Sequence, residues 1–353
     1  MDFVKVLEAK KKLVWREIEK YLQKPLNLTG QLKIPPKYQK EADFHWQLVR
    51  DYPERKGKYL RPTLLLLTAQ AMGFPEKKAI KTAAAMQTSE DWMLGHDDFE
   101  DNSLERRGKP ALHRLYNPGL AVNAGDALHM LMWKILNDNK KILGAKKACE
   151  INDEFYQMIA RTCLGQTVEM RWAQENKNNL TDEDIFFVLE GKTVYYTIAG
   201  PMRLGAILAG ATPKQLETIY EFARPLGLCF QIKDDLLDLT SDFAGLKKQK
   251  GNDIYEGKRT IMLAHLFRNI KGKEKKKLAE IMKKGRDEKK ESEIVWVLAM
   301  MKKYGSLRYG EKLAEKLDVQ AKEIFRQKLD FLSHQPARNQ IMAGIDFVLQ
   351  RKY

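Results

Sequence analysis

The sequence predicts an all-α protein, and three observations support this prediction. Apolar residues recur at spacings of three and four along almost all of the 353 residues, which is the period of an amphipathic helix. Short groups of glycine, proline and asparagine separate these stretches. No segment alternates apolar and polar residues convincingly as a strand does. Many helices joined by short loops are typical of a helical bundle, so we expect a single domain over residues 1–353.

The predicted elements follow one another with short interruptions. Residues 2–23 form the first expected helix, and Pro25, Pro35, Pro36 and Pro53 then indicate a connecting region of shorter pieces. Further helices are expected over residues 61–72, 76–96, 119–138, 142–174, 182–190, 193–209, 213–239, 259–270, 274–284, 291–303, 305–328 and 338–350. The stretch 193–209 is apolar on most faces, which predicts a buried central helix.

Charge and cysteine content narrow the class of protein. The chain has 62 Lys and Arg against 47 Asp and Glu, and a net charge of +15 suits nucleic acid, anionic membranes or phosphorylated substrates. Without a zinc-type spacing or an RNA-binding signature, we do not expect nucleic acid as a partner. Cys149, Cys163 and Cys229 are widely spaced and indicate a reducing compartment without disulfides. The first residues lack the apolar core of a signal peptide and no apolar run could span a bilayer, so we expect a cytoplasmic protein without a transmembrane segment.

Two acidic clusters carry the strongest functional signal. Residues 97–101 read DDFED and residues 234–238 read DDLLD, so both follow the pattern DDxxD. Carboxylates this close repel one another and need compensating positive charge. The stretch 226–240 predicts a helix, on which residues four apart share a face. Each cluster can thus offer oxygens to Mg²⁺, which keeps positions for water and phosphate. The metal ligands we expect are Asp97, Asp98, Asp101, Asp234, Asp235 and Asp238.

Basic and polar residues accompany both clusters. Arg106 and Arg107 follow the first cluster, and forked guanidinium groups there could hold two separate anions or one. Lys58 and Arg61 lie three apart where Pro62 could begin a helix, which makes a plausible anion site. Segments that are weak evidence on their own are Lys192-Thr193, Gln231 and residues 248–260.

Taken in order, these segments resemble the trans-isoprenyl diphosphate synthases, the head-to-tail prenyltransferases. The resemblance covers about residues 55–260. Besides the first DDxxD, it includes GKxxR at 57–61, RRG at 106–108, KT at 192–193, FQIxDDxxD at 230–238 and GxDIxxGKxT at 251–260. It implies an all-α homodimer with a cavity between the acidic clusters and three Mg²⁺ ions.

The resemblance also implies a reaction and a role for each residue. An allylic diphosphate ionises with the help of Mg²⁺, and isopentenyl diphosphate attacks the resulting cation. The residues implied to contact the allylic diphosphate or its leaving group are Arg106, Lys192, Thr193, Gln231, Lys248 and Lys258. The residues implied to hold isopentenyl diphosphate are Lys58, Arg61 and Arg107.

Residues just before the first cluster bear on substrate and product. The family usually has His, sometimes Gln, where this chain has Glu90, and an acid facing a diphosphate is unfavourable unless it is protonated, paired or turned away. Glu90 could pair with Lys58 or Arg61 in an empty site. The resemblance implies that Trp92 and Met93 floor the pocket for the prenyl tail, although plain core packing also explains Trp92. An aromatic at this position resembles the archaeal type of geranylgeranyl diphosphate synthase, so we expect that product; farnesyl diphosphate or a longer chain are alternatives.

Two other classes of function are compatible with parts of the pattern. Class I terpene cyclases also ionise allylic diphosphates, but they usually carry an Asn/Ser/Glu motif in place of the second DDxxD, which is intact here. A non-catalytic subunit that regulates a partner synthase tends to lose one acidic motif, and only Glu90 favours that interpretation. The pattern therefore favours the synthase.

Overall fold

The structure, a computed structural model, describes residues 2–23, 28, 30–240 and 250–349. The chain divides into two compact units, described separately below. Unit 1 comprises Met1–Asp153, Leu204–Ala211 and His334–Gln340, and unit 2 comprises Glu154–Arg203, Thr212–Ser333 and Ile341–Tyr353. The helices shared by both units are α8 (Ala145–Gln174), α10 (Gly200–Leu208) and α17 (Ala337–Leu349). The prediction of one domain over residues 1–353 stays a prediction.

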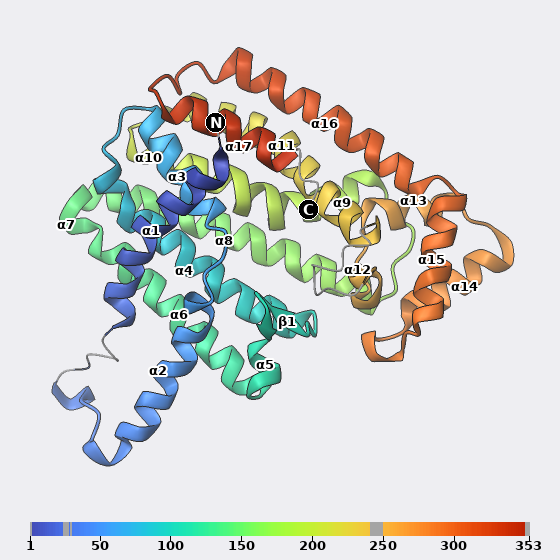
Figure 1. The fold of residues 1–353 in the computed structure, drawn as a ribbon, viewed down its shortest axis with the longest axis horizontal. Coiled ribbons are helices and arrows are strands. Elements are labelled where there is room, and N and C mark those ends of the chain that lie inside the picture. Colours follow the sequence, from blue (N-terminus) through green and yellow to red (C-terminus); the bar gives the residue numbers. More distant parts are fainter. Residues whose placement is uncertain (1, 24–27, 29, 241–249, 350–353) are drawn as a thin grey trace. The chain divides into compact units, whose positions relative to one another are not determined.

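Helix α4 is central to unit 1. The elements that lie wholly in unit 1 are α1 (Phe3–Leu22), η1 (Gly30–Leu32), η2 (Pro36–Tyr38), α2 (Gln39–Glu54), α3 (Leu60–Ala71), α4 (Glu76–Glu100), β1 (Glu105–Arg106), β2 (Lys109–Pro110), α5 (Leu112–Leu115), α6 (Pro118–Asp138) and α7 (Lys140–Leu143). Helix α4 packs against α1, α2, α3, α5 and α6, and its run beside α6 is visible in Figure 1. Most residues of α3 are buried, as expected of a helix that is apolar on nearly every face.

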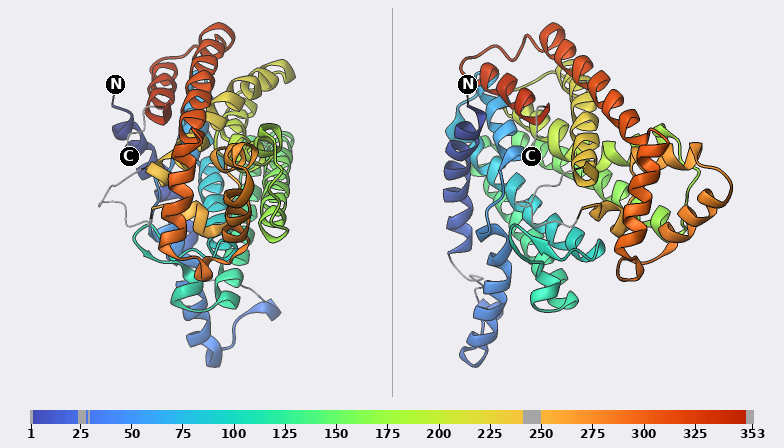
Figure 2. Two further views of the ribbon diagram at one scale, coloured as in Figure 1. Left: turned by 90° about the vertical axis from the view of Figure 1, so that its right-hand side faces the viewer. Right: turned by 45° about the vertical axis from the view of Figure 1, so that its right-hand side comes forward.

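Helix α11 has the same central position in unit 2. The elements here are α9 (Asp182–Leu189), the π-helix η3 (Glu190–Ala199), α11 (Pro213–Thr240), α12 (Asn252–Glu256), α13 (Ile261–Asn269), α14 (Gly272–Lys283), η4 (Arg286–Glu288), α15 (Glu291–Lys303) and α16 (Ser306–Lys328). Helix α11 packs against α9, η3, α12 and α16, and the long helix α16 can be followed in Figure 2. The rings of Phe222 and Phe325, with centroids 5.4 Å apart, join α11 to α16.

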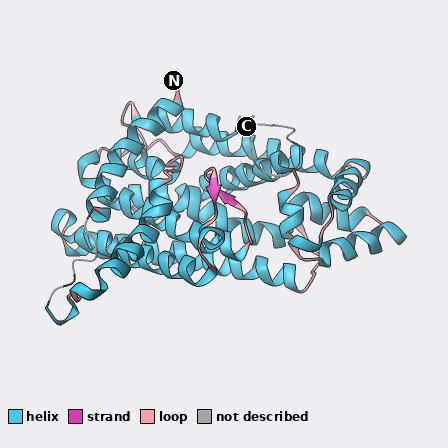
Figure 3. Cartoon of the chain, turned by 60° about the horizontal axis from the view of Figure 1, so that its bottom comes forward, coloured by secondary structure: helices cyan, strands magenta, loops and turns pink. Residues whose placement is uncertain are grey.

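The all-α prediction is confirmed, and Figure 3 shows helices almost throughout. None of the described helices is both long and apolar enough to cross a membrane. Cys149, Cys163 and Cys229 form no disulfide in the part of the chain that the structure describes.

Four local predictions were wrong. The helix expected over residues 142–174 is interrupted at Gly144, between α7 and α8. The connecting region expected from the prolines contains the 16-residue helix α2, because Pro36 precedes it and Pro53 falls in its last turn. Residues 193–209 do not form one helix, since the π-helix η3 precedes α10. No strand was predicted, whereas the residues after the first acidic cluster form the short hairpin β1–β2.

Candidate active site

The first acidic cluster lies at the carboxyl end of α4. Asp97 and Asp98 are in the last turn and Asp101 caps the helix. This turn contains no basic residue, and the carbonyl groups at this end of a helix carry partial negative charge. Asp97 and Asp101 are partly exposed, whereas Asp98 is buried. The cluster is therefore strongly negative and would stabilise a bound cation.

Asp98 is fixed by Arg106 and Tyr52. Arg106 Nε donates to the two carboxylate oxygens of Asp98 at 2.9 and 3.0 Å, and Nη2 donates as well. The hydroxyl of Tyr52 donates to Oδ2 at 2.6 Å and accepts a 3.3 Å hydrogen bond from the backbone N–H of Leu112. Burial and the charge of Asp98 raise the pKa of Tyr52. Metal binding by Asp98 stays a prediction, and both of its oxygens are engaged by Arg106 in this structure.

Arg106 and Arg107 reach different carboxylates because Arg106 ends strand β1 whereas Arg107 lies in the tight turn that follows it. Strands β1 and β2 are antiparallel, and the two-residue turn between them consists of Arg107 and Gly108, with φ of 54° and 76°. Positive φ at both positions is the feature of a type I′ turn. Arg106 pairs with Asp98, whereas Arg107 pairs with Asp91 at 2.8 Å. The structure therefore shows two separate anion contacts for the adjacent arginines.

A second ion-pair cluster lies beside this turn. Glu90 Oε2 is 3.2 Å from Arg61 Nη1, and its Oε1 is 3.4 Å from Arg107 Nη2. Burial raises the pKa of Asp91 to about 6, although the charge of Arg107 opposes the shift. The predicted pairing of Glu90 with Arg61 is thus confirmed. Lys58 lies exposed in the connection before α3.

Trp92 lies in the contact between α4 and α6. Its ring stacks on His129, with centroids 4.0 Å apart and an interplanar angle of 10°. Trp133 Nε1 donates to His129 Nε2 at 2.9 Å, which holds the imidazole in place. Trp92 is 7% exposed, and Met93 is partly exposed. The indole is therefore a rigid group one turn before the first acidic cluster.

The second acidic cluster lies in the last turns of α11. Asp234 and Asp238 are partly exposed and Asp235 is buried, so the pattern of the first cluster recurs. Gln231 Nε2 donates to Asp235 Oδ1 at 2.8 Å. Burial raises the pKa of Asp235 well above its ordinary value, and the charge of Asp253 adds to the shift. A carboxyl group this destabilised in its charged form needs a proton or a cation.

The π-helix η3 brings Thr193 to this cluster. Thr193 Oγ1 donates to Gln231 Oε1 at 2.7 Å, so a hydrogen-bonded chain joins Thr193, Gln231 and Asp235. The close approach depends on Gly227, where an added Cβ would lie 2.9 Å from the Cα of Val194. Lys192 Nζ pairs with Glu169 of α8 at 2.5 Å. Thr193, from the KT motif, therefore forms one network with Gln231 and Asp235 of the FQIxDDxxD motif.

The segment after the second cluster folds back onto it. The backbone N–H of Asp253 donates to Asp238 Oδ2 at 3.0 Å. Lys258 Nζ lies 2.6 Å from Glu256 and 3.8 Å from Asp253. Glu256 in turn accepts a 3.0 Å hydrogen bond from Arg286 of η4. Lys258 is thus positioned beside the acidic residues that follow α11.

The prediction for Lys248 falls outside the described residues, as that part of the chain is not among them.

Comparison with known proteins identifies the family. The family model described as polyprenyl synthetase matches residues 45–301. The chain belongs to the polyprenyl synthetase family. The predicted class, a trans-prenyltransferase that synthesises isoprenyl diphosphates, is confirmed by this membership and by the relatives below.

Several relatives and solved structures are similar over most of their length. A short chain isoprenyl diphosphate synthase of Methanothermobacter thermautotrophicus is 32% identical, covering 84% of this chain and 87% of the relative. A geranylgeranyl diphosphate synthase of Methanosarcina mazei is 31% identical over 84% of this chain and 86% of its own. The crystal structure of geranylgeranyl pyrophosphate synthetase from Pyrococcus horikoshii has a TM-score of 0.83 at 27% identity, covering 99% of this chain and 98% of that one. The Corynebacterium glutamicum enzyme, solved with isoprenyl diphosphate and magnesium, has a TM-score of 0.84 at 21% identity over 100% of both chains and supports the fold alone.

The residues of this polyprenyl synthetase fit a divalent cation. Both clusters end long helices whose last turns lack basic residues, and Asp235 is held in an unfavourable environment for its charge. Their oxygens are hard ligands of the kind Mg²⁺ prefers. Among the residues that the structure describes, no three His, Cys, Asp or Glu side chains already surround a common point. Metal binding by these carboxylates stays a prediction.

Sequence reasoning missed several residues of this polyprenyl synthetase site. Tyr52 lies far in sequence from Arg106 and Arg107, and Asp91 lies within helix α4. No local sequence pattern indicates that either residue belongs to the site. Asp253 could have been predicted, because it is the acidic residue of the GxDIxxGKxT motif. The partners that no signal indicated are His129, Glu169, Glu256 and Arg286.

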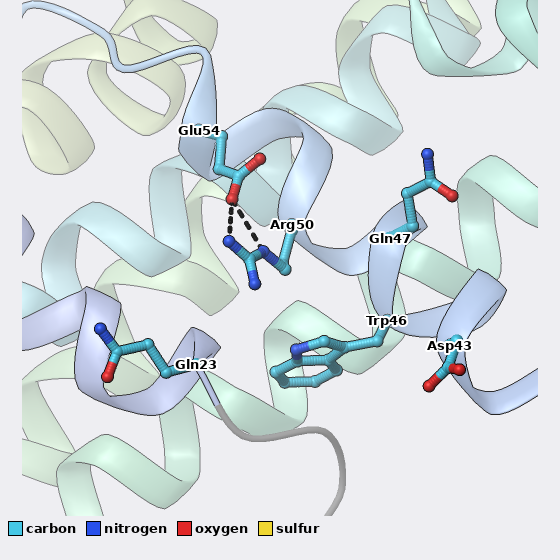
Figure 4. Close-up of a pocket in the computed structure, with 6 residues that line it drawn as sticks. All are labelled: Gln23, Asp43, Trp46, Gln47, Arg50 and Glu54. Carbon is cyan, nitrogen blue, oxygen red and sulfur yellow. Dashed lines mark hydrogen bonds and ion pairs between the residues drawn. The ribbon is translucent and has the colours of Figure 1, made fainter. Parts of the chain in front are cut away.

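A surface hollow elsewhere in unit 1 contains none of the predicted residues. Its volume is about 380 Å³, and its lining is Gln23, Asp43, Trp46, Gln47, Arg50 and Glu54. Figure 4 shows Arg50 directed at Glu54, with Nε donating at 2.7 Å. Arg50 and Glu54 are thus already paired with each other within the hollow.

Proposed function

We propose that this protein condenses isopentenyl diphosphate with an allylic diphosphate in an Mg²⁺-dependent, head-to-tail reaction, with geranylgeranyl diphosphate as the product. The observation that carries the proposal is the pair of DDxxD clusters, each ending a long helix whose last turn has no basic residue. Two such negative sites suit metal ions that bind a diphosphate.

The exposed aspartates of each cluster are the proposed metal ligands. Asp97 and Asp101 are partly exposed and lie four residues apart, as do Asp234 and Asp238. Their carboxylates would hold the ions, which we propose are three in number. Mg²⁺ bound there would offset the negative charge that develops on the departing diphosphate. In our proposal Asp98 holds Arg106 beside the first cluster, and Asp235 holds Gln231 beside the second.

The lysines assigned to the allylic diphosphate belong to unit 2, and Arg106, also assigned to it, lies in strand β1. Lys192 and Lys258 each carry a carboxylate partner, Glu169 and Glu256, which would keep the ammonium groups oriented until the substrate arrives. Thr193 and Gln231 would complete this contact, and Lys248 remains assigned by resemblance. Arg61, Arg107 and Lys58 are the proposed holders of isopentenyl diphosphate.

Trp92 is the proposed limit on product length. The large ring one turn before the first cluster is held by His129 and would end the space for the prenyl tail. Relatives named geranylgeranyl diphosphate synthase support this product, and one relative is named a geranylfarnesyl diphosphate synthase, so a longer product is the alternative. We further propose a cytoplasmic homodimer.

The purified chain tests this proposal directly. It would be incubated with Mg²⁺, isopentenyl diphosphate and each allylic primer, and the dephosphorylated products would be sized. We expect geranylgeraniol after dephosphorylation, and no product in the presence of a chelator. A failure to condense any primer would refute the synthase, and a cyclic hydrocarbon would indicate a cyclase instead.

A further inference from the structure

One carboxylate bridges the two arginines assigned to isopentenyl diphosphate. Glu90 places one oxygen 3.2 Å from Arg61 and the other 3.4 Å from Arg107. Only 11% of its side chain is exposed, so solvent screens these ion pairs weakly. The carboxylate therefore makes the two-point contact that a diphosphate would make with the same guanidinium groups.

Arg107 cannot easily turn toward another partner. Its Nη1 donates to the backbone carbonyl of Tyr52 at 3.0 Å and to Asp91 at 2.8 Å. The guanidinium also lies against Gly57, where an added Cβ would be 2.6 Å from Nη2. With the arginine fixed, a competing anion must displace Glu90.

The charges of this cluster cancel. Arg61 and Arg107 contribute two positive charges, and Glu90 and Asp91 would contribute two negative charges when ionised. A diphosphate that arrives while Glu90 remains in place meets a neutral cluster and a nearby like charge, which disfavours binding.

We infer that Glu90 competes with the diphosphate of isopentenyl diphosphate for Arg61 and Arg107, and that it thereby sets the KM for this substrate. The inference rests on the proposed function and identifies the residue that tunes one of its two substrate sites. In this inference Glu90 determines the affinity for isopentenyl diphosphate, because it moves away from the arginines each time that substrate binds.

The test compares Glu90→Gln and Glu90→His with the wild-type chain. The KM for isopentenyl diphosphate is measured at a saturating allylic diphosphate, and the Kd for isopentenyl diphosphate alone is measured by calorimetry in metal-free buffer. We expect both constants to fall about tenfold, since a neutral side chain removes the competing charge, while kcat changes less than KM. The histidine variant keeps the test informative if the glutamine variant does not fold.

Glu17→Gln is the matched control. Glu17 bridges Lys20 and Lys81 at 2.5 and 2.7 Å, and its side chain is also 11% exposed. This variant removes an equivalent bridging carboxylate on α1 and should leave both constants for isopentenyl diphosphate unchanged.

The outcomes separate the inference from the proposed function. An unchanged or raised Kd in both Glu90 variants overturns the inference, whether or not the chain condenses substrates. If the wild-type chain forms no product but the variants bind isopentenyl diphosphate more tightly, the inference stands and the proposed function fails. If Glu17→Gln lowers the constants equally, the effect is general charge and the inference is refuted.

Discussion

The Asp98→Ala variant should be less stable to unfolding than the wild-type protein, whereas the Asp97→Ala variant should be about as stable. Asp98 is 0% exposed and accepts hydrogen bonds from Arg106 and Tyr52. Removing one partner of a buried ion pair leaves an uncompensated charge and costs about 3–5 kcal/mol. Because 23% of the Arg106 side chain is exposed, we take the lower end, about 3 kcal/mol. For a unit of this size that loss lowers the melting temperature by roughly 6–12 °C.

Asp97 is the matched neighbour. Its side chain is 28% exposed, and the nearest guanidinium atom of Arg106 is 3.9 Å away, so its removal should cost less than about 1 kcal/mol. Thermal unfolding in chelator measures stability without metal, and steady-state condensation measures activity. We expect Asp97→Ala to melt like the wild-type chain but to lose at least about a hundredfold in kcat, as a metal ligand should. Equal melting temperatures for Asp98→Ala and wild type would refute the structural role of the Arg106 pair.

Three further predictions concern product length, helix packing and pH. Trp92→Ala should lengthen the product when chains are sized after dephosphorylation, and His129→Ala, which removes the ring stacked on it, should do so to a smaller degree; unchanged length in both would exclude this stack as the limit. Gly227→Ala should cost about 1–3 kcal/mol and reduce kcat/KM, because the new Cβ pushes η3 from α11, whereas Gly95→Ala adds a Cβ with nothing within 4 Å and should not destabilise. Since burial raises the pKa of Asp91 to about 6, the folded state holds its proton more tightly than the unfolded state, and this stabilisation is lost as pH rises from about 4 through 6. Urea unfolding at pH 4.5 and 6.5 should show that Asp91→Asn removes about 2 kcal/mol of this dependence, and parallel profiles for both proteins would contradict it.

Most helices were predictable because their own sequences carry the signal. Helices α1, α9 and α15 agree with the predicted ranges to within one residue, since each shows a clear helical period between polar or glycine-containing connections. Helix α2 was not predicted because several nearby prolines suggested a non-helical region, although none of them lies in the middle of the helix. Pro53 lies in the last turn, where few of the helix's hydrogen bonds are lost.

The partners within the site were not predictable from local pattern. The sequence shows that Arg106 and Arg107 are adjacent, but the positive φ of Arg107 and Gly108 separates their side chains. An Arg-Gly pair is not among the common signals of a type I′ turn, so the hairpin went unseen. The contacts of Arg107 with Glu90 and Asp91 follow from that turn, and they depend on how distant segments pack.

The repeated DDxxD pattern hides a division of roles that helix geometry explains. Residues four apart share a helix face, whereas the residue after the first is rotated by about 100° toward a neighbouring face. In α4 this second aspartate is buried and bonded to Arg106, and in α11 it is buried and bonded to Gln231. The first and third aspartates of both clusters are partly exposed. One helical motif therefore presents two carboxylates outward and uses a third to hold a polar partner inside.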